Sequence, residues 1–174
     1  MTKAFTIWLT GIPGAGKTTI ARELVEVLGP EIGSLAHLDG DDIRRDALYT
    51  LGFGREDRDT NIRVLAYVAR TLNLHGTPAV VAAISPYAET RLEARKMIDQ
   101  FVEVHVECPV EVCIERDPKG LYKRALAGEI PNLTGLNDPY EAPLDPEIRV
   151  ATATESASDS ALQIIEALRG LGHI

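Results

Sequence analysis

The stretch GIPGAGKTT, residues 11–19, follows directly on the apolar run FTIWL at residues 5–9. Its first eight residues match the pattern G-x-x-x-x-G-K-[ST], with a predicted strand before them and a predicted helix after them. Glycines let the backbone curl until several N–H groups face one anion, and the following helix adds the positive end of its dipole. The pattern therefore predicts a phosphate-binding loop.

Two side chains should complete this loop: Lys17 is expected to act catalytically on the β- and γ-phosphates of ATP, and the Thr18 hydroxyl to hold Mg²⁺. The motif alone does not identify the reaction, because switches, motors and small-molecule kinases all use it. A GTPase would normally show a base-reading N-K-x-D sequence, and the chain contains none. The residues expected to contact the nucleotide are Gly11, Pro13, Gly14, Ala15, Gly16, Lys17, Thr18 and Thr19.

Length and composition limit the classes of protein to consider. The 174 residues, 45% of them hydrophobic, fit one domain spanning 1–174. A formal net charge of −8 predicts that neither nucleic acid nor an anionic membrane is a partner. The chain has no apolar run of about 20 residues and no secretory leader pattern, so we expect a cytoplasmic protein. Cys108 and Cys113 match no common zinc spacing and are expected to be buried core thiols.

Short β-branched runs alternate with longer segments of helical period, which predicts βαβ units. We expect an α/β protein with a single-domain P-loop NTPase fold: a five-stranded, mostly parallel sheet with helices on both faces and a lid. The predicted strands are Phe5–Thr10, Leu35–Leu38, Ala79–Ile84, Val102–Glu107 and Ile148–Ala151. The predicted helices are about Lys17–Leu28, Asp41–Leu48, Asp59–Leu74, Ala88–Asp99, Val110–Glu115 and Ser156–Leu168, the last packing Leu162, Ile165 and Leu168 on the sheet.

The interval from about 117 to 142 breaks this rhythm. It contains prolines at 118, 131 and 139, glycines at 120, 128 and 135, and a basic cluster. Segments of this length inside compact domains are usually lids, binding loops or disordered. We therefore expect the lid here.

Acidic residues close the second predicted strand in the stretch LDGDD, residues 38–42. Ligands gather at the carboxyl ends of the strands in open α/β sheets, so these acids should face the phosphate-binding loop. A kinase needs a carboxylate near the acceptor hydroxyl and often another directed to Mg²⁺ through water, roles that Asp39 and Asp41 can fill. The alternative for Asp41 and Asp42 is capping of the next helix.

Half of the 18 basic residues gather in two segments of a chain that is acidic overall. As a group they indicate an anionic acceptor opposite the nucleotide, although solvated helix faces better explain Arg45 and Arg124 individually. The nine residues are Arg44, Arg45, Arg55, Arg58, Arg63, Arg116, Lys119, Lys123 and Arg124.

Ser85 and Pro86 end the third predicted strand. They fit the N-cap and the first position of the following helix. A hydroxyl at the carboxyl end of a strand is also well placed to contact a phosphate or sulfate, so both roles remain open for Ser85.

Together these motifs resemble the adenylylsulfate kinase family, whose members phosphorylate the 3′-hydroxyl of adenosine 5′-phosphosulfate (APS) with MgATP. The resemblance covers nearly the whole chain. Each short piece is weak evidence, but their order and spacing are highly specific. The motifs are GIPGAGKTT from 11, LDGD from 38 followed by Arg44, LGF at 51–53, Asp57-Arg58 with Asn61-Ile62-Arg63, Ile84-Ser85-Pro86-Tyr87, DPKGLYK from 117 and DPYEAP from 138.

The resemblance implies roles for the matching residues and a homodimer. Asp39 and Asp41 would be the acids nearest the acceptor hydroxyl and the metal, and Lys119 would enter the site when the lid closes. In some members the serine at the position of Ser85 has been implicated in a phosphoenzyme, but direct in-line transfer is the simpler chemistry and the one we expect. The implied acceptor contacts are Asp41 and Lys119, with Arg44, Arg58 and Asn61 at the phosphosulfate, Phe53 stacked on the adenine, and Ile84 and Ser85 on its other side.

Several positions depart from the family pattern. Asp42 replaces the usual Asn, Arg45-Asp46-Ala47-Leu48 replaces His-Gly-Leu-Asn, and Leu133 replaces an aromatic residue that covers adenine. The added negative charge should weaken phosphosulfate binding unless Arg45 compensates. Leu133 is expected to contact the acceptor as apolar cover while losing part of the about 1–3 kcal/mol of base stacking. Two alternatives remain open: a P-loop kinase with another nucleotide-linked anionic acceptor, and a nucleotide-binding regulator without turnover.

Overall fold

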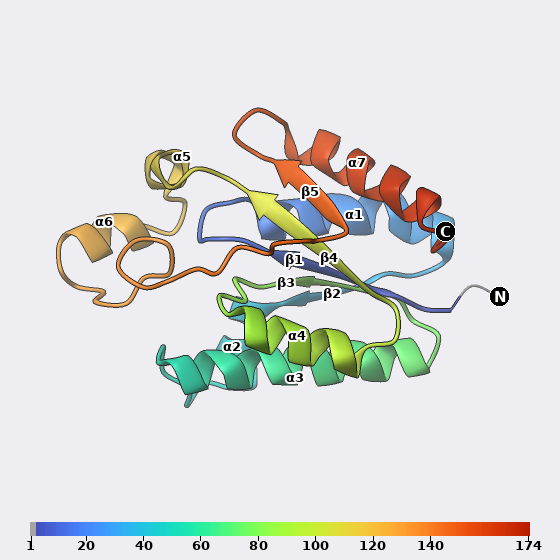
Figure 1. Cartoon of the computed structure of the whole chain (residues 1–174), viewed down its shortest axis with the longest axis horizontal. Coiled ribbons are helices and arrows are strands. Elements are labelled where there is room, and N and C mark those ends of the chain that lie inside the picture. The colour runs from blue at the N-terminus through green and yellow to red at the C-terminus, as the bar shows by residue number, and fades with distance from the viewer. Residues whose placement is uncertain (1–2) are drawn as a thin grey trace.

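The computed structural model describes residues 3–174 and shows a five-stranded sheet between two layers of helices (Figure 1). The strands are β1 (Thr6–Thr10), β2 (Ala36–Asp39), β3 (Ala79–Ala82), β4 (Phe101–Glu107) and β5 (Ile148–Ala151). The helices are α1 (Lys17–Ile32), α2 (Gly40–Asp46), α3 (Arg55–Leu74), α4 (Ala88–Met97), α5 (Val110–Arg116), α6 (Leu121–Leu126) and α7 (Ala157–Gly170). The strand order is β2-β3-β1-β4-β5 and every neighbouring pair is parallel, which confirms the predicted fold class.

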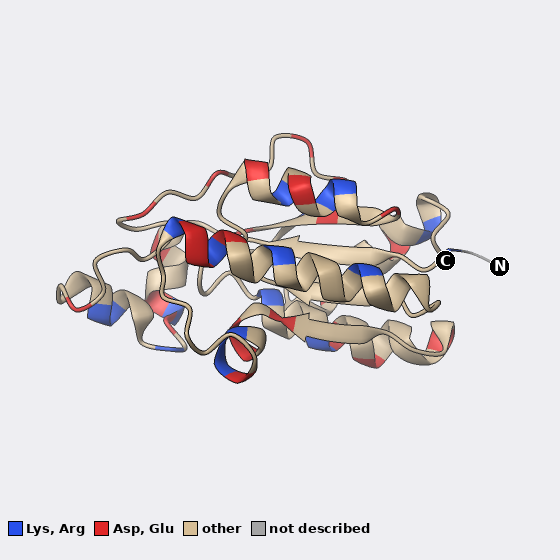
Figure 2. Ribbon diagram, turned by 90° about the horizontal axis from the view of Figure 1, so that it is seen from below, with Lys and Arg blue, Asp and Glu red and all other residues tan. Residues whose placement is uncertain are grey.

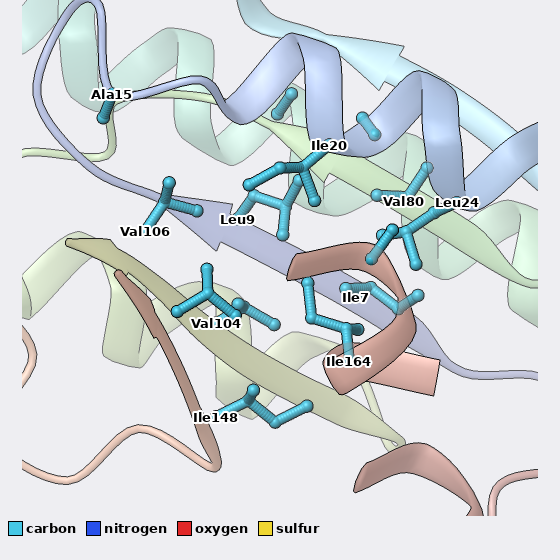
Figure 3. Packing of buried hydrophobic residues seen from close by; sticks show 14 of the residues in the cluster. Ile7, Leu9, Ala15, Ile20, Leu24, Val80, Val104, Val106, Ile148 and Ile164 are labelled. Carbon is cyan, nitrogen blue, oxygen red and sulfur yellow. The ribbon is translucent and has the colours of Figure 1, made fainter. Parts of the chain in front are cut away.

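The central strand β1 divides the core by the alternation of its side chains. Ile7 and Leu9 point to the face covered by α1 and α7, whereas Trp8 points to the face covered by α3 and α4. All three side chains are fully buried. Figure 3 shows Ile7 and Leu9 among the aliphatic side chains of Leu24 in α1 and Ile164 in α7. Burial on both faces explains why β3 is a continuous apolar run, AVVA, and why β1 adds only threonines to its apolar residues.

The long helix α3 begins at Arg55, four residues before the predicted start at Asp59. The prediction was wrong because the buried apolar stripe begins only at Ile62, while the first turn carries Glu56 and Asp57. Acidic side chains stabilise the positive N-terminal end of a helix, so this turn forms without an apolar face.

The connection from β3 to α4 also differs from the prediction. β3 ends at Ala82 rather than Ile84, and the N-cap of α4 is Tyr87 rather than Ser85. Beyond Ala82 the chain leaves the sheet, and the carbonyl oxygen of Ile84 accepts a hydrogen bond from the Thr10 hydroxyl at 2.7 Å instead of pairing with a neighbouring strand. Ser85 then adopts a φ of 48°, which is the left-handed region and not the extended conformation that an N-cap needs.

At the C-terminal end of the chain, α7 starts with a reciprocal capping box between Ser156 and Asp159. The predicted packing face of this helix was partly wrong, because Leu162 is 55% exposed. The buried stripe follows i, i+3, i+4, i+7 spacing, and Leu162 lies beside it. The buried stripe consists of Ala161, Ile164, Ile165 and Leu168.

The predicted lid contains the short helix α6 and otherwise lacks named elements. It lies beyond the carboxyl ends of the strands, on the left of Figure 1. Figure 2 shows that charged residues lie mainly on helices and loops, while the strands are mostly uncharged. Of the two cysteines, Cys113 is buried as predicted and Cys108 is only half-buried. Across residues 3–174, no helix is both long and apolar enough to cross a bilayer.

Candidate active site

The phosphate-binding loop connects β1 to α1 and requires its glycines. Gly14 and Gly16 have φ values of 78° and 99°, a backbone conformation that L side chains rarely adopt. A Cβ atom on Gly11 would lie 2.6 Å from the carbonyl oxygen of Val106 in β4. The loop therefore curls as the sequence predicts, with its backbone against the sheet.

Lys17 already points back into this loop. Its Nζ donates to the carbonyl oxygens of Gly11 at 2.8 Å and Ile12 at 2.9 Å. Burial lowers the pKa of Lys17 to about 8, although the negative charge of Asp41 opposes this shift. The ammonium group is thus held where a bound anion would stabilise its charge.

Thr18 and Asp39 join the loop to the end of β2. The Thr18 hydroxyl donates to Oδ2 of Asp39 at 2.7 Å, and Oδ1 of Asp39 accepts from the backbone N–H of Asp41 at 2.9 Å. Asp39 is therefore the N-cap of α2, which corrects the alternative that assigned capping to Asp41 or Asp42. The carboxylates lie beside the loop, as the sheet topology predicts.

The carboxylate of Asp41 forms an ion pair with Lys119 from the lid. Burial acts to lower the pKa of Lys119, but the hydrogen bond and charge of Asp41 outweigh it and raise the pKa above the ordinary value. Both side chains are more than half exposed, so water screens the pair. The contact brings the lid to the edge of the phosphate-binding loop.

Arg44 and Phe53 lie together on the side of α2. The guanidinium carbon of Arg44 is 5.0 Å from the centroid of the Phe53 ring, and its NH1 donates to the carbonyl oxygen of Gly52. Burial lowers the pKa of Arg44. The Phe53 ring is 63% exposed, which leaves it available to a flat ligand.

Arg58 is almost fully buried and holds the lid in this structure. It donates to the Thr134 hydroxyl at 2.7 Å and to the Asn132 carbonyl oxygen at 2.5 Å, and it forms an ion pair with Asp138. The nearby Asn61 donates to the carbonyl oxygen of Gly40 at 3.3 Å. Its Oδ1 is buried and has no hydrogen-bond partner among the described residues, which fits a polar ligand at this position.

Of the remaining predicted acceptor residues, Ser85 and Leu133 are buried and Ile84 is half-buried. The Ser85 side chain is 1% exposed, and its Oγ accepts from Nε1 of Trp8 at 3.0 Å. The positive φ of Ser85 costs about 1–3 kcal/mol for a residue other than glycine, and surrounding bonds must offset this strain. Ile84 places its carbonyl against Thr10, and Leu133 is 7% exposed within the core cluster that includes Ile12.

Two residues that support the loop had no predicted role. The buried Tyr122 hydroxyl donates to the carbonyl oxygen of Pro13 at 2.8 Å, and the Thr152 hydroxyl donates to that of Ala15 at 2.8 Å. The NH2 group of Arg116 donates to the carbonyl oxygen of Thr152 at 2.5 Å and so holds Thr152 in place. Thr152 directly follows β5, and its position at the carboxyl end of a predicted strand could have indicated a role near the phosphate-binding loop.

The acidic departures near α2 are paired within their own segment. Arg45 donates to Asp42 at 2.7 Å and binds both carboxylate oxygens of Asp46, at 2.7 Å and 2.6 Å. These hydrogen bonds raise the pKa of Arg45 and lower that of Asp46. The expected compensation of charge by Arg45 therefore has a geometric basis.

The adenylylsulphate kinase family model matches residues 3–151 of the chain. The chain belongs to this family. An adenylyl-sulfate kinase from Rippkaea orientalis is 50% identical over 169 residues, which covers 97% of this chain and 93% of that protein. The adenylyl-sulfate kinase of Myxococcus xanthus is 44% identical over 172 residues, or 97% of this chain and 92% of that protein.

Solved structures agree with this membership. The Mycobacterium tuberculosis APS kinase in complex with AMPPNP and APS superposes with a TM-score of 0.90 at 40% identity, covering 97% of this chain and 99% of that one. Shikimate kinase from Aquifex aeolicus, with a TM-score of 0.60 and 17% identity, shares the fold alone. The resemblance inferred from the motifs is confirmed, and the chain is an ATP-dependent kinase with an alcohol acceptor.

Proposed function

We propose that this enzyme transfers the γ-phosphate of MgATP to the 3′-hydroxyl of APS, giving ADP and 3′-phosphoadenosine 5′-phosphosulfate. The observation that carries the proposal is the 2.7 Å hydrogen bond between Thr18 and Asp39. It sets a carboxylate from the end of β2 directly beside the loop that holds the phosphates. An acceptor hydroxyl held by this carboxylate would adjoin the terminal phosphate, as phosphoryl transfer requires. The complex of a 40% identical APS kinase with AMPPNP and APS supports the choice of both substrates.

The donor side consists of the loop backbone and Lys17. Backbone N–H groups from Gly11 to Thr19 would bind the β- and γ-phosphates, and the Lys17 ammonium would stabilise charge that develops in the transition state. Among residues 3–174, no three His, Cys, Asp or Glu side chains gather into a metal site. The hard oxygens of Thr18 and Asp39 nevertheless suit Mg²⁺, which keeps several waters and takes its other ligands from phosphate. A bound Mg²⁺ would neutralise phosphate charge.

The acceptor side would be formed by residues around α2, α3 and the β3–α4 connection. We propose that Asp39 or Asp41 aligns the 3′-hydroxyl and takes its proton. Phe53 would stack on the adenine. Arg58 would exchange part of its bonding to the lid for the phosphosulfate when APS binds. The other proposed acceptor contacts are Arg44, Asn61, Ile84, Ser85, Lys119 and, as apolar cover, Leu133.

Direct in-line transfer is favoured over a phosphorylated Ser85. The Ser85 hydroxyl is 1% exposed and already accepts a hydrogen bond from Trp8. A nucleophile needs a neighbouring base to remove its proton, and no carboxylate or histidine is among the hydrogen-bond partners of this hydroxyl in the described chain. In direct transfer, Lys119 would act on the ATP phosphates as the lid closes and excludes water.

An acceptor panel tests the proposal. The enzyme is incubated with MgATP and either APS, AMP, adenosine or another nucleotide-linked anion, and kcat/KM is measured with product identification by mass spectrometry. The account expects APS to give the highest kcat/KM and a product phosphorylated at the 3′ position. A clearly higher kcat/KM with another anion would show that this anion, and not APS, is the acceptor. Tight ATP binding without acceptor-dependent ADP release would instead indicate a regulator.

The assembly and location proposed here are those implied by the sequence, a homodimer in the cytoplasm. One related APS kinase, from Thiobacillus denitrificans, is described as hexameric, so light scattering of the purified protein should discriminate between the two assemblies. A mass corresponding to two chains of 18.9 kDa would support the dimer.

A further inference from the structure

Arg91 of α4 binds carbonyl groups of two segments, the β3–α4 connection that supplies proposed acceptor contacts and the end of the lid. Its NH1 donates to the carbonyl oxygen of Ser85 at 2.6 Å, and its NH2 donates to that of Glu141 at 2.6 Å. Ser85 belongs to the β3–α4 connection, whereas Glu141 lies at the C-terminal end of the lid. A single guanidinium thus joins two segments that are distant in sequence.

The charge of Arg91 is balanced inside the fold. The side chain is 4% exposed, and its Nε donates to Oε1 of Glu103 in β4 at 2.9 Å. The other oxygen of Glu103 accepts from Arg95 at 3.4 Å, and the Glu103 backbone N–H donates to Glu147 at 2.7 Å. The planar guanidinium therefore has its edges fixed by partners in three segments, which leaves it little freedom to rotate.

Further hydrogen bonds tie the end of the lid to the start of α4. The backbone N–H of Glu141 donates to the carbonyl oxygen of Pro86 at 2.8 Å, and the Glu141 carboxylate accepts from the backbone N–H of Ala88 at 2.7 Å. The Tyr140 hydroxyl lies 3.0 Å from that of Thr10 at the end of β1. The lid therefore has a fixed boundary at 140–141, next to the guanidinium of Arg91.

Ser85 is the part of the pocket that most needs such support. Its φ of 48° is unfavourable for a side chain other than glycine, so the surrounding bonds must hold it. Arg91 holds its carbonyl oxygen and Trp8 holds its hydroxyl. Loss of the Arg91 bond would let Ser85 and the neighbouring Ile84 turn away from their present directions.

We infer that Arg91 is a positioning residue that keeps the acceptor pocket in shape by fixing Ser85 and the end of the lid at Glu141. The inference rests on the proposed function, because the pocket is the one proposed to hold APS. Among the described residues, the hydrogen-bond partners of the Arg91 side chain are Ser85, Glu103 and Glu141, and none belongs to the phosphate-binding loop. Its loss should therefore affect the acceptor much more than ATP.

The kinetic test is Arg91→Lys, which keeps the charge but cannot bond both carbonyl groups together. The expected result is a rise of about tenfold or more in KM for APS with KM for ATP within about twofold, since small displacements of a bound substrate have large effects. Arg95→Lys is the matched control, because Arg95 also pairs with Glu103 but bonds neither Ser85 nor Glu141. An unchanged KM for APS in Arg91→Lys, or a parallel change of both KM values in the two variants, would overturn the inference.

Hydrogen exchange of the ligand-free enzyme separates this inference from the choice of substrate. The amides of Glu141 and Ala88 should be protected in the wild type and exchange about tenfold faster or more in Arg91→Lys, while amides of α1 stay unchanged. If the wild type proves inactive on APS, the proposed function fails but this measurement still tests Arg91. Rapid exchange of Glu141 and Ala88 in the wild type would contradict a fixed lid boundary, even if the variant does not fold.

Discussion

The Thr18 hydroxyl donates to Oδ2 of Asp39, and the other oxygen of the same carboxylate caps α2 through the N–H of Asp41. One side chain thus links the phosphate-binding loop, the end of β2 and the first turn of α2. Because the cap fixes its rotation, the carboxylate has one orientation toward the loop. Asp39 therefore has two roles, capping α2 and presenting a carboxylate to the substrates, and substitutions can separate the two.

Asp39→Asn should keep the cap and lose the chemistry. The amide oxygen of Asn can still accept from Asp41, so the free energy of unfolding should change little, whereas Asp39→Ala should lose about 1 kcal/mol of capping. Both variants should lower kcat by about 10²–10³, because neither retains the carboxylate that Thr18 holds beside the phosphate-binding loop. Steady-state kinetics and thermal unfolding check the two effects. A kcat for Asp39→Asn within about threefold of wild type would show that Asp39 only caps.

Lys17 should give the enzyme an alkaline limit. Its pKa of about 8 in the ligand-free structure lies below the ordinary 10.5, so the ammonium that attracts phosphate is lost as pH rises through about 8. The value of kcat/KM for ATP, which reports the free enzyme, should fall above that pH. Between the two pKa values the unfolded chain binds more protons, so this group makes the ligand-free fold more stable as pH rises.

The matched variant for this pH profile is Lys17→Ala. It should fold and lose activity by about 10²–10³, because the lysine acts mainly on charge in the transition state. Its residual kcat/KM for ATP should lack the decline near pH 8. The same decline in the variant would assign it to another group.

Arg45 should offset the two acidic departures near the acceptor pocket. Arg45→Gln leaves the negative charges of Asp42 and Asp46 uncompensated, and because solvent screens such exposed charges, KM for APS should rise by no more than about fivefold. Replacing both acids by Asn in the same variant should restore the wild-type KM. The rise should also shrink in about 0.5 M salt because screening weakens surface charges. A rise that persists in the triple variant would mean that Arg45 itself contacts the substrate.

Lys119 should matter to turnover more than to the initial binding of ATP. It sits on the lid and pairs with Asp41, so Lys119→Ala should lower kcat by about 10²-fold while the Kd for ATP stays within about threefold. Lys123→Ala is the control, since Lys123 lies on the same lid in α6. Equal losses in the two variants would indicate a general effect of lid charge.

The phosphate-binding loop and the position of Asp39 and Asp41 beside it could be predicted from the sequence. Each depends on local chemistry: glycines where φ is positive, and carboxylates directly after a strand. The parallel sheet followed from the alternation of apolar runs and helical segments.

Features set by contacts between distant segments could not be predicted in the same way. Ser85 fits a helix cap locally, but bonds from Trp8 and Arg91 hold it in another conformation. Arg58 is predicted to bind the acceptor, but its bonds to the lid in this structure follow only from the tertiary fold. Leu133 was predicted to cover a base, and its burial in the core with Ile12 reflects how the lid packs.

The most direct measurement is a crystal structure of the enzyme with AMPPNP, Mg²⁺ and APS. We expect the 3′-hydroxyl of APS to lie within hydrogen-bond reach, about 2.6–3.2 Å, of the Asp39 or Asp41 carboxylate and in line with the γ-phosphorus. We also expect Lys17 and the Thr18 hydroxyl at the phosphates and metal. A complex in which both carboxylates lie far from the γ-phosphate would contradict the proposed transfer.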